Sequence, residues 1–253
     1  MILPEMPSMS LDGKVALITG ASSGIGQGAA VALAQTGAHV LCAARGKKRL
    51  LETVEQLLGK GWKAEAFILD VTDQAKVKDL FSKNKIDIVV NSAGLARHSP
   101  ALETRSEDFD DVIDVNLKSA YFLSSIAARA MIKSKIKGSI IHVSSQMAYV
   151  GGIDRAVYSA SKHALEGMIK SMAIEWGDKD IRINSVCPTF IRTPLTEPTF
   201  QNPERVKWIK EKIKLGRVGT VPDVMGAIFY LASDLSELVT GTSILVDGGW
   251  TAD

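Results

Sequence analysis

The sequence predicts an α/β protein built on one doubly wound parallel sheet of seven strands, with helices on both faces. Strand-like and helix-like segments alternate along nearly the whole chain, as expected for a parallel sheet. The strand-like segments are near-continuous runs of Val, Ile and Leu, which are typical of strands buried on both faces. No repeat, low-complexity tract or linker divides the 253 residues, and 46% hydrophobic residues allow one large core.

Short apolar runs bounded by turn residues predict the strands, and longer runs with a helical period predict the helices. The expected strands are Lys14–Thr19, His39–Ala44, Ala64–Leu69, Ile86–Asn91, Ser139–Val143, Ile181–Val186 and Ser243–Val246. The expected helices are Gly26–Thr36, Lys47–Gly59, Thr72–Lys83, Ser106–Asp114, Leu117–Lys133, Ala156–Gly177, Pro203–Lys214 and Val221–Ser233. Residues 11–253 are therefore expected to form a single domain, preceded by a flexible arm at residues 1–10, where two prolines occur.

Composition and charge restrict the partners. The formal net charge is +2, and the densest basic cluster is the short stretch Gly46–Arg49, so neither nucleic acid nor a membrane is an expected partner. The two cysteines lie far apart in the sequence, which argues against a disulfide framework and a zinc site, and no metal is expected. The first residues lack the pattern of a signal peptide and no apolar run is long enough to span a bilayer, so a cytoplasmic location is expected.

A glycine-rich turn joins the first strand to the first helix. Gly20, Gly24 and Gly26 allow a tight turn and the close approach of a ligand, and the N-terminus of the helix attracts phosphate. A P-loop is excluded because Gln27 stands where that motif needs lysine. We therefore expect a dinucleotide pyrophosphate here, with contacts to Gly20, Ser22, Ser23, Gly24, Ile25 and Gly26. The alternative is a tight strand–helix turn that binds no ligand.

The end of the second strand indicates which dinucleotide binds. Arg45 follows it, and no acid occurs until Glu52; an arginine suits the extra phosphate of NADP, whereas a carboxylate suits NAD. NADP(H) is the preferred cofactor and NAD(H) stays possible, with a solvated Arg45 as the alternative. At the end of the third strand, Asp70 either reaches the adenine edge together with Val71 or caps the following helix.

A tyrosine and a lysine lie four residues apart on the expected helix Ala156–Gly177, so Tyr158 and Lys162 share one face. Tyrosine has a pKa of about 10, and a nearby ammonium lowers that pKa. The pair is therefore a candidate general acid/base. Ser145, at the end of the fifth strand, is placed to hydrogen-bond a substrate oxygen.

Together these motifs resemble the short-chain dehydrogenase/reductase family in its classical form. The resemblance covers the chain from about Leu11 to Gly249 and adds Asn116 and the stretch Asn91–Gly94 to the motifs above. It implies a Rossmann fold and a catalytic set of Asn116, Ser145, Tyr158 and Lys162. In that set Lys162 binds the nicotinamide ribose and lowers the pKa of the tyrosine, and Asn116 holds a relay water. The alternative for Asn116 is a polar residue bonded to backbone.

The resemblance also implies cofactor contacts from Asn91, Ala93, Gly94, Tyr158, Lys162, Pro188, Thr189, Ile191 and Thr193. Thr189 departs from the glycine usual in the family, but matches the xylulose and carbonyl reductase subgroup, which the chain resembles more weakly together with sugar dehydrogenases. A homotetramer is a further implication, through the long helix Ala156–Gly177 and the chain end Leu245–Trp250.

Substrate contacts are expected from residues at or beside the catalytic positions, Ser145, Gln146, Tyr149, Tyr158 and Phe190, and from His98, which follows the fourth strand near the expected substrate mouth. The alternative for His98 is a surface loop residue. Residues 193–215 are expected to form a lid, and its polar content suggests a sugar, polyol or dicarbonyl. The expected activity is the NADP(H)-dependent interconversion of a secondary alcohol and a ketone. One alternative is a 3-oxoacyl-thioester reductase, whose acyl carrier would dock on Arg97, Arg192 and Arg205; another is a non-catalytic nucleotide-sensing protein.

Overall fold

Seven strands form one parallel sheet in the computed structural model, which describes residues 3–252. In chain order they are β1 (Val15–Thr19), β2 (His39–Ala44), β3 (Ala64–Ile68), β4 (Ile88–Asn91), β5 (Gly138–Val143), β6 (Ile181–Pro188) and β7 (Ser243–Val246). Their order across the sheet is β3-β2-β1-β4-β5-β6-β7. The predicted fold class is therefore confirmed. The order reverses between β1 and β4, where a crevice for ligands is expected in such sheets.

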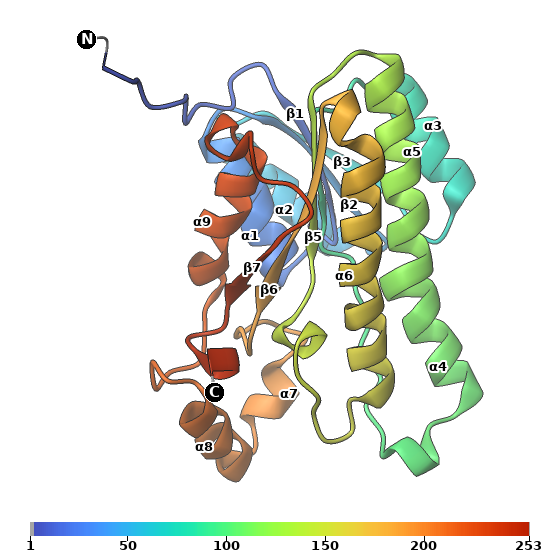
Figure 1. Ribbon diagram of the computed structural model, residues 1–253, viewed down its shortest axis with the longest axis vertical. Helices are drawn as coiled ribbons and strands as arrows, with labels where there is room; N and C mark the ends of the chain where they lie inside the picture. Colours follow the sequence, from blue (N-terminus) through green and yellow to red (C-terminus); the bar gives the residue numbers. More distant parts are fainter. Residues whose placement is uncertain (1–2, 253) are drawn as a thin grey trace.

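Helices cover both faces of the sheet. They are α1 (Gly24–Gln35), α2 (Lys47–Gly59), α3 (Gln74–Lys83), α4 (Ser106–Ile113), α5 (Ser119–Lys133), α6 (Ala156–Trp176), α7 (Glu197–Phe200), α8 (Pro203–Lys212) and α9 (Val221–Ala232). One core cluster joins α1, α2 and α9 to the sheet, and the other joins α3, α5 and α6 to its opposite face. Figure 1 shows these two groups on either side of the strands.

The alternation of side chains along each strand divides the core between these faces. In β1, Ala16 and Ile18 pack in the cluster with α1 and α9, whereas Leu17 packs in the cluster with α5 and α6. All three side chains are fully buried. This explains why the strand is an unbroken apolar run rather than an alternating one.

Three local features differ from the expected elements. Helix α1 begins at Gly24, two residues earlier than expected, because Ser23 takes the N-cap position. The expected helix Leu117–Lys133 is preceded by a π-helical turn, Asp114–Lys118. A short helix, α7, precedes α8 within the expected lid.

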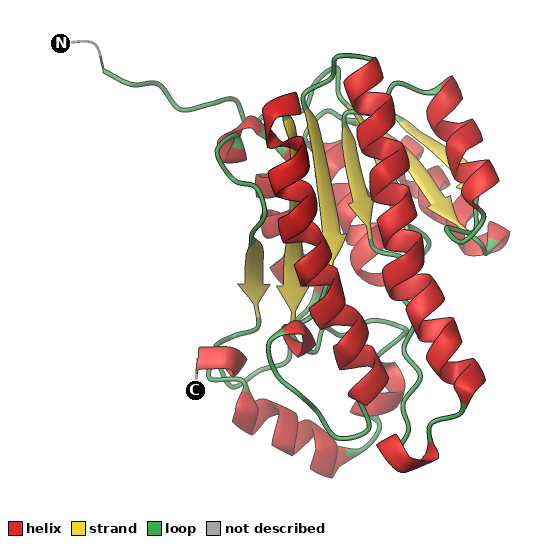
Figure 2. Cartoon of the chain, turned by 45° about the vertical axis from the view of Figure 1, so that its right-hand side comes forward, coloured by secondary structure: helices red, strands yellow, loops and turns green. Residues whose placement is uncertain are grey.

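The strands point their carboxyl ends toward one end of the molecule, where α7 and α8 lie (Figure 2). Functional residues that follow the strands therefore gather at this end. Residues 3–10 form no helix or strand and are exposed; the first two residues of the expected arm and the last residue of the expected domain lie outside the described residues. Within residues 3–252, none of the helices has the length and apolar character needed to cross a bilayer.

Candidate active site

A cavity of about 580 Å³ opens at the carboxyl ends of the central strands. It brings together most of the residues expected to bind the cofactor: Gly20, Ser22, Ser23, Gly24, Ile25, Arg45, Asp70, Val71, Ala93, Gly94, Tyr158, Lys162, Pro188, Thr189, Ile191 and Thr193. Ser145 also lines it. Gly26, Asn91 and Asn116 do not line the cavity, and each has a structural contact described below. The expected substrate contacts His98, Gln146, Tyr149 and Phe190 do not line it either.

The glycine turn lies at the floor of this cavity. Gly20 has a φ of +69°, and a Cβ there would come within 2.8 Å of the carbonyl oxygen of Ser92. The turn therefore requires glycine at this position. Ser23 caps α1 without using its side chain, so its hydroxyl stays available at the positive end of the helix. Gly26 lies behind the turn, where a Cβ would collide with the backbone of Gly20.

Two arginines lie where β2 ends. Arg45 and Arg49 both line the cavity, Arg45 with most of its side chain exposed. Arg49, in the first turn of α2, was not among the expected cofactor contacts, although it lies only four residues after Arg45. The acid at this end is Asp70, whose Oδ2 lies 3.9 Å from Arg45.

Asp70 accepts hydrogen bonds from the backbone and hydroxyl of Thr72 but is not the cap of the next helix. That cap is Asp73, which accepts from the backbone N–H of Lys76 at the start of α3. Asp70 therefore closes a local turn and lines the cavity at the same time.

A buried chain of hydrogen bonds runs behind the cavity, across three strands and one helix. Thr19 donates to Asn91 over 2.7 Å, the Asn91 amide meets His142 Nδ1 at 3.2 Å, and His142 Nε2 lies 2.9 Å from Ser124 Oγ. Thr19 also accepts from the backbone N–H of Ala93 over 3.2 Å. Asn91 thus supports the loop that lines the cavity, through Thr19.

Tyr158 and Lys162 lie one turn apart on α6, as predicted. The ammonium of Lys162 is 5.7 Å from the centre of the Tyr158 ring and donates to the carbonyl of Val143 over 3.0 Å. Burial lowers the pKa of Lys162 to about 8, against smaller opposing effects of Cys187 and Glu166.

The expected lowering of the tyrosine pKa is wrong for this structure. Burial raises the pKa of Tyr158 above its ordinary value, and this effect outweighs the hydrogen bond with Ser145 and the charge of Arg155, which lower it. The desolvation of the phenol therefore dominates over its neighbouring charges. Ser145 also accepts from the backbone of Met147 and donates to Gln146, which fixes its rotamer.

Asn116 lies in the π-helical turn before α5, and its side chain is fully engaged. Its amide nitrogen donates to the carbonyl of Leu95 over 2.8 Å and to Ser161, and its oxygen accepts from the N–H of Leu95 over 2.8 Å. The side chain therefore joins α5 and α6 to the loop after β4. This matches the alternative of a polar residue bonded to backbone, and the relay water stays a prediction.

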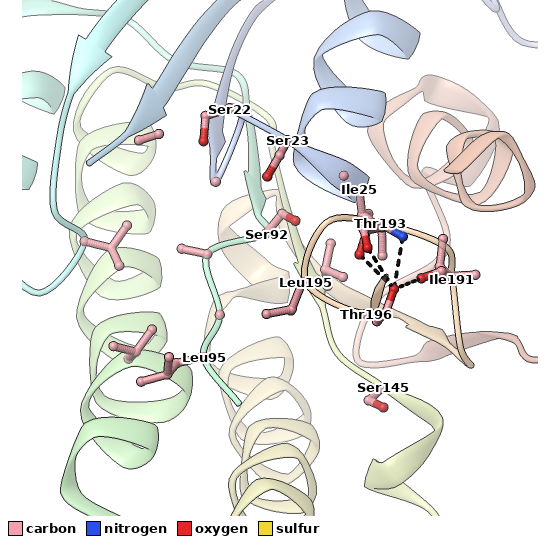
Figure 3. A pocket seen from close by; sticks show the side chains of 18 of the residues that line it. Ser22, Ser23, Ile25, Ser92, Leu95, Ser145, Ile191, Thr193, Leu195 and Thr196 are labelled. Carbon is pink, nitrogen blue, oxygen red and sulfur yellow. Dashed lines mark hydrogen bonds between the residues drawn. The ribbon is translucent and has the colours of Figure 1, made fainter. Parts of the chain in front are cut away.

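The first residue of the expected lid, Thr193, packs against the glycine turn at Gly24. The methyl group of Thr193 would lie 3.2 Å from a Cβ on Gly24, and Thr196 links Thr193 to the carbonyl of Ile191 (Figure 3). Leu195 and Thr196 line the cavity but were not among the expected contacts. The side chain of Thr189 lines the cavity as well, and its buried hydroxyl has no hydrogen-bond partner.

These features fit a bound dinucleotide. The glycine turn lines the cavity with its backbone, and Thr189 carries an unsatisfied buried hydroxyl where the cavity passes β6. Serine hydroxyls and a helix N-terminus suit the pyrophosphate. Within residues 3–252, no cluster of His, Cys, Asp and Glu side chains is arranged to hold a metal ion.

Comparison with known proteins decides the family. A family model described as enoyl-(acyl carrier protein) reductase matches residues 20–251. The 2-dehydro-3-deoxy-D-gluconate 5-dehydrogenase of Dickeya dadantii is 36% identical over 250 residues, covering 97% of this chain and 98% of its own. The chain belongs to the short-chain dehydrogenase/reductase family. It is therefore an oxidoreductase.

Other members of the family are similar over their whole length. The 3-oxoacyl-(acyl-carrier-protein) reductase of Thermotoga maritima is 39% identical, covering 95% of this chain and 99% of its own. Human L-xylulose reductase is 36% identical, covering 96% and 98%. The crystal structure of a gluconate 5-dehydrogenase from Burkholderia cenocepacia, in complex with NADP and tartrate, superimposes with a TM-score of 0.93 at 30% identity, covering 97% and 98%.

The residues expected to contact substrate lie in several different environments in this short-chain dehydrogenase. His98 meets the Tyr158 ring edge-on at 6.2 Å, beside the candidate acid/base. Phe190 packs against Trp250 at 5.6 Å, and Trp208 packs against the same ring at 5.4 Å. Gln146 is buried next to Ser145, and Tyr149 is exposed.

Burial and the charges of Arg155 and Arg205 lower the pKa of His98 to about 4. The imidazole is thus neutral near pH 7, and it lies in a positive electrostatic environment. Neither arginine stood among the expected substrate contacts, because their effect on His98 depends on the tertiary fold.

Proposed function

We propose that this chain is an NADP(H)-dependent oxidoreductase that interconverts a secondary alcohol and a ketone on a small polyhydroxylated substrate. The observation that carries the proposal is the position of Tyr158, with Ser145 and Lys162, at a cavity that also holds the glycine turn. A proton-transfer group and a dinucleotide site within one cavity match the two halves of an alcohol oxidation.

Each catalytic side chain has a role that its contacts support. Tyr158 passes a proton to or from the substrate oxygen. Ser145, held by the backbone N–H of Met147, turns its one hydroxyl proton from Gln146 to the same oxygen when substrate binds. Lys162, held by the carbonyl of Val143, keeps a positive charge beneath the tyrosine. The bound cofactor supplies or accepts the hydride.

The choice of NADP rests on the end of β2. Arg45 and Arg49 line the cavity there, and they provide two guanidinium groups for the 2′-phosphate. The exposure of Arg45 supports this role, because its only ion-pair partner among the described residues is Asp70, at 3.9 Å. The related gluconate 5-dehydrogenase that was crystallised with NADP agrees with the choice.

A polyhydroxylated substrate is favoured over a long acyl chain. Phe190 and Trp208 each pack against Trp250, so these apolar side chains already have partners within the protein. Two arginines of the possible acyl-carrier surface are neutralised: Arg97 pairs with Asp108 and Asp111, and Arg192 pairs with Glu197. The names of the gluconate dehydrogenase and xylulose reductase relatives agree with a sugar-type substrate.

The test is the absorbance of the reduced nicotinamide with purified protein and a panel of ketoses, sugar acids, dicarbonyls and 3-oxoacyl thioesters. We expect faster oxidation of NADPH than of NADH, with a polyhydroxylated carbonyl preferred. A preference for acyl thioesters would replace the proposed substrate class. Tight binding of NADPH without turnover of any carbonyl class would instead favour the non-catalytic nucleotide sensor.

We also propose a homotetramer, assembled through α6 and the chain end around β7. Ile174 on α6 and Leu245 on β7 are exposed apolar side chains on these surfaces. Light scattering of the purified protein tests this assembly, and a monomeric mass at micromolar concentration would exclude it.

A further inference from the structure

A buried guanidinium lies at the start of α6. Arg155 is only 7% exposed, and its Nη1 atom is buried without any hydrogen-bond partner. Its aliphatic stem packs beside Gly152 and Met147; a Cβ on Gly152 would lie 3.0 Å from the Arg155 Cγ. A buried charge without a partner is costly unless an anion pairs with it.

The backbone holds this arginine firmly in place. The N–H of Arg155 donates to the carbonyl of Gly152 over 3.2 Å, and its own carbonyl accepts from Ser159 over 2.7 Å. The preceding residue, Asp154, has a φ of +60°, which is unusual for a residue other than glycine. Such strain persists where the surrounding structure enforces it, and it is often found at functional sites.

The position of Arg155 brings it next to the candidate acid/base. It lies three residues before Tyr158, on the same side of the helix, and its charge lowers the pKa of Tyr158. Burial, followed by the charge of Arg205, lowers the pKa of Arg155 itself to about 10. Arg155 therefore remains charged at neutral pH and within electrostatic reach of the reacting group.

A second cation comes from the lid. Arg205 lies in the first turn of α8, is half-buried, and its charge lowers the pKa of both Arg155 and His98. The charge of Asp154 has the opposite effect and raises the pKa of both Arg155 and His98. Within residues 3–252, however, no carboxylate forms an ion pair with Arg155 or Arg205. Two like charges from separate elements thus act on each other and on His98, whose ring meets Tyr158, and this is unfavourable without an anion between them.

We propose that Arg155 and Arg205 form a subsite for the carboxylate of a hydroxy-acid or keto-acid substrate, with its reacting carbon at Tyr158. This rests on the proposed function and narrows its substrate class to sugar acids. A guanidinium fork matches the planar geometry of a carboxylate. A single negative charge also suits the two cations and Asp154 better than a doubly charged phosphate.

Matched pairs of ligands test the charge directly. D-glycerate, L-threonate and D-gluconate are each compared with the polyol of the same length: glycerol, threitol and glucitol. Calorimetry with the NADP complex measures binding, and reduction of NADP measures turnover. We expect at least one acid to bind at least about 30-fold more tightly than its polyol. Binding of no acid above its polyol would overturn the subsite.

The variant Arg155→Met then assigns the effect to this side chain. We expect the acid's affinity to fall about 30- to 1000-fold, because one partner of a buried charged pair is removed. The affinity for the polyol should change less than about threefold. Arg155→Lys should recover part of the loss, and Arg129→Met, on the exposed surface of α5, is the control for the substitution itself.

If Arg155→Met does not fold, Arg205→Met on the half-buried lid tests the same subsite, with a smaller expected loss confined to the acid. Selective binding of glucitol 6-phosphate over gluconate would overturn the carboxylate in favour of a phosphate.

Binding of NADPH, followed by its fluorescence, distinguishes a failure of the subsite from a failure of the proposed function. If NADPH binds but no acid is preferred, the subsite alone is wrong; if NADPH does not bind, the proposed function is wrong as well.

Discussion

The carboxylate of Glu166 accepts a hydrogen bond from the hydroxyl of Ser185 over 2.9 Å, inside the protein and one helical turn beyond Lys162. Ser243 donates to the same oxygen, and the thiol of Cys187 lies 3.6 Å from the other one. Glu166 is only 6% exposed. A buried negative charge is thus held behind the lysine by groups of β6 and β7.

This arrangement predicts a shift in the pH dependence of the enzyme. Glu166 raises the pKa of Lys162, which burial lowers to about 8. In Glu166→Gln the opposing charge is lost, so the pKa of Lys162 falls further and the ammonium is lost at lower pH. The alkaline limb of the kcat/KM profile should move to lower pH, with about a tenfold loss on that limb for each unit. Ser185→Ala, which keeps the charge, should move it much less, and equal shifts in both variants would contradict the charge effect.

Tyr158→Phe separates chemistry from binding. Removing the phenol hydroxyl should lower kcat by about 100- to 10,000-fold, the range typical for a general acid or base. NADPH affinity, measured by nucleotide fluorescence, should stay within about threefold because the ring and Lys162 remain. Activity close to that of the wild type would exclude Tyr158 as the proton-transfer group.

The two arginines at the end of β2 predict the cofactor preference. Arg45→Ala combined with Arg49→Ala should weaken NADP binding by about 10- to 100-fold, because charge-assisted hydrogen bonds to the phosphate are lost. NAD binding should hardly change. Titration calorimetry with both nucleotides measures the ratio, and an equal loss for NAD would indicate damage to the fold of the site instead.

The buried histidine predicts a loss of stability in mild acid. Burial, with a smaller effect of Lys162, lowers the pKa of His142 to about 3 from 6.5. Between these two values the unfolded chain binds a proton that the folded protein does not, so stability falls as the pH falls. The loss from pH 7 to pH 5 should be about 2 kcal/mol.

Urea unfolding at pH 7, 6 and 5 measures this dependence. In His142→Gln the fall in stability should be smaller, whereas His163→Gln, which changes an exposed histidine, should leave it unchanged. An identical pH dependence in wild type and His142→Gln would show that other groups cause the acid sensitivity. Asp223, whose pKa is lowered by Arg217 and Thr220, titrates below this window.

Most of the fold could be predicted because the signals are local. Each strand is an apolar run and each long helix has its own period, so the parallel sheet and its doubly wound layers followed from the alternation of these segments. The sequence left Asp70 as either an adenine contact or the cap of the next helix; the cap is Asp73, which only the backbone geometry selects. The helix α7 was missed because it has only four residues and contains Pro198.

The features of the site also fall into those that short sequence motifs reveal and those that only the tertiary fold sets. The glycine turn and the Tyr158–Lys162 pair are short sequence motifs, so they were visible. The raised pKa of Tyr158 was not, because it reflects burial by segments far apart in the chain. The subsite proposed for Arg155 and Arg205 also depends on where the fold places α6 and α8, and no spacing in the sequence gives the distance between residues fifty positions apart.

The hydrogen-bonded chain through Thr19, Asn91, His142 and Ser124 also limits which substitutions this sequence can accept during evolution. Each member satisfies its neighbour, so a single replacement by an apolar residue strands a buried polar group. Simultaneous replacement of two or all four of these residues avoids leaving a buried polar group without a partner. Among natural variants of this chain, an apolar residue at position 142 should therefore be accompanied by altered residues at 91 and 124.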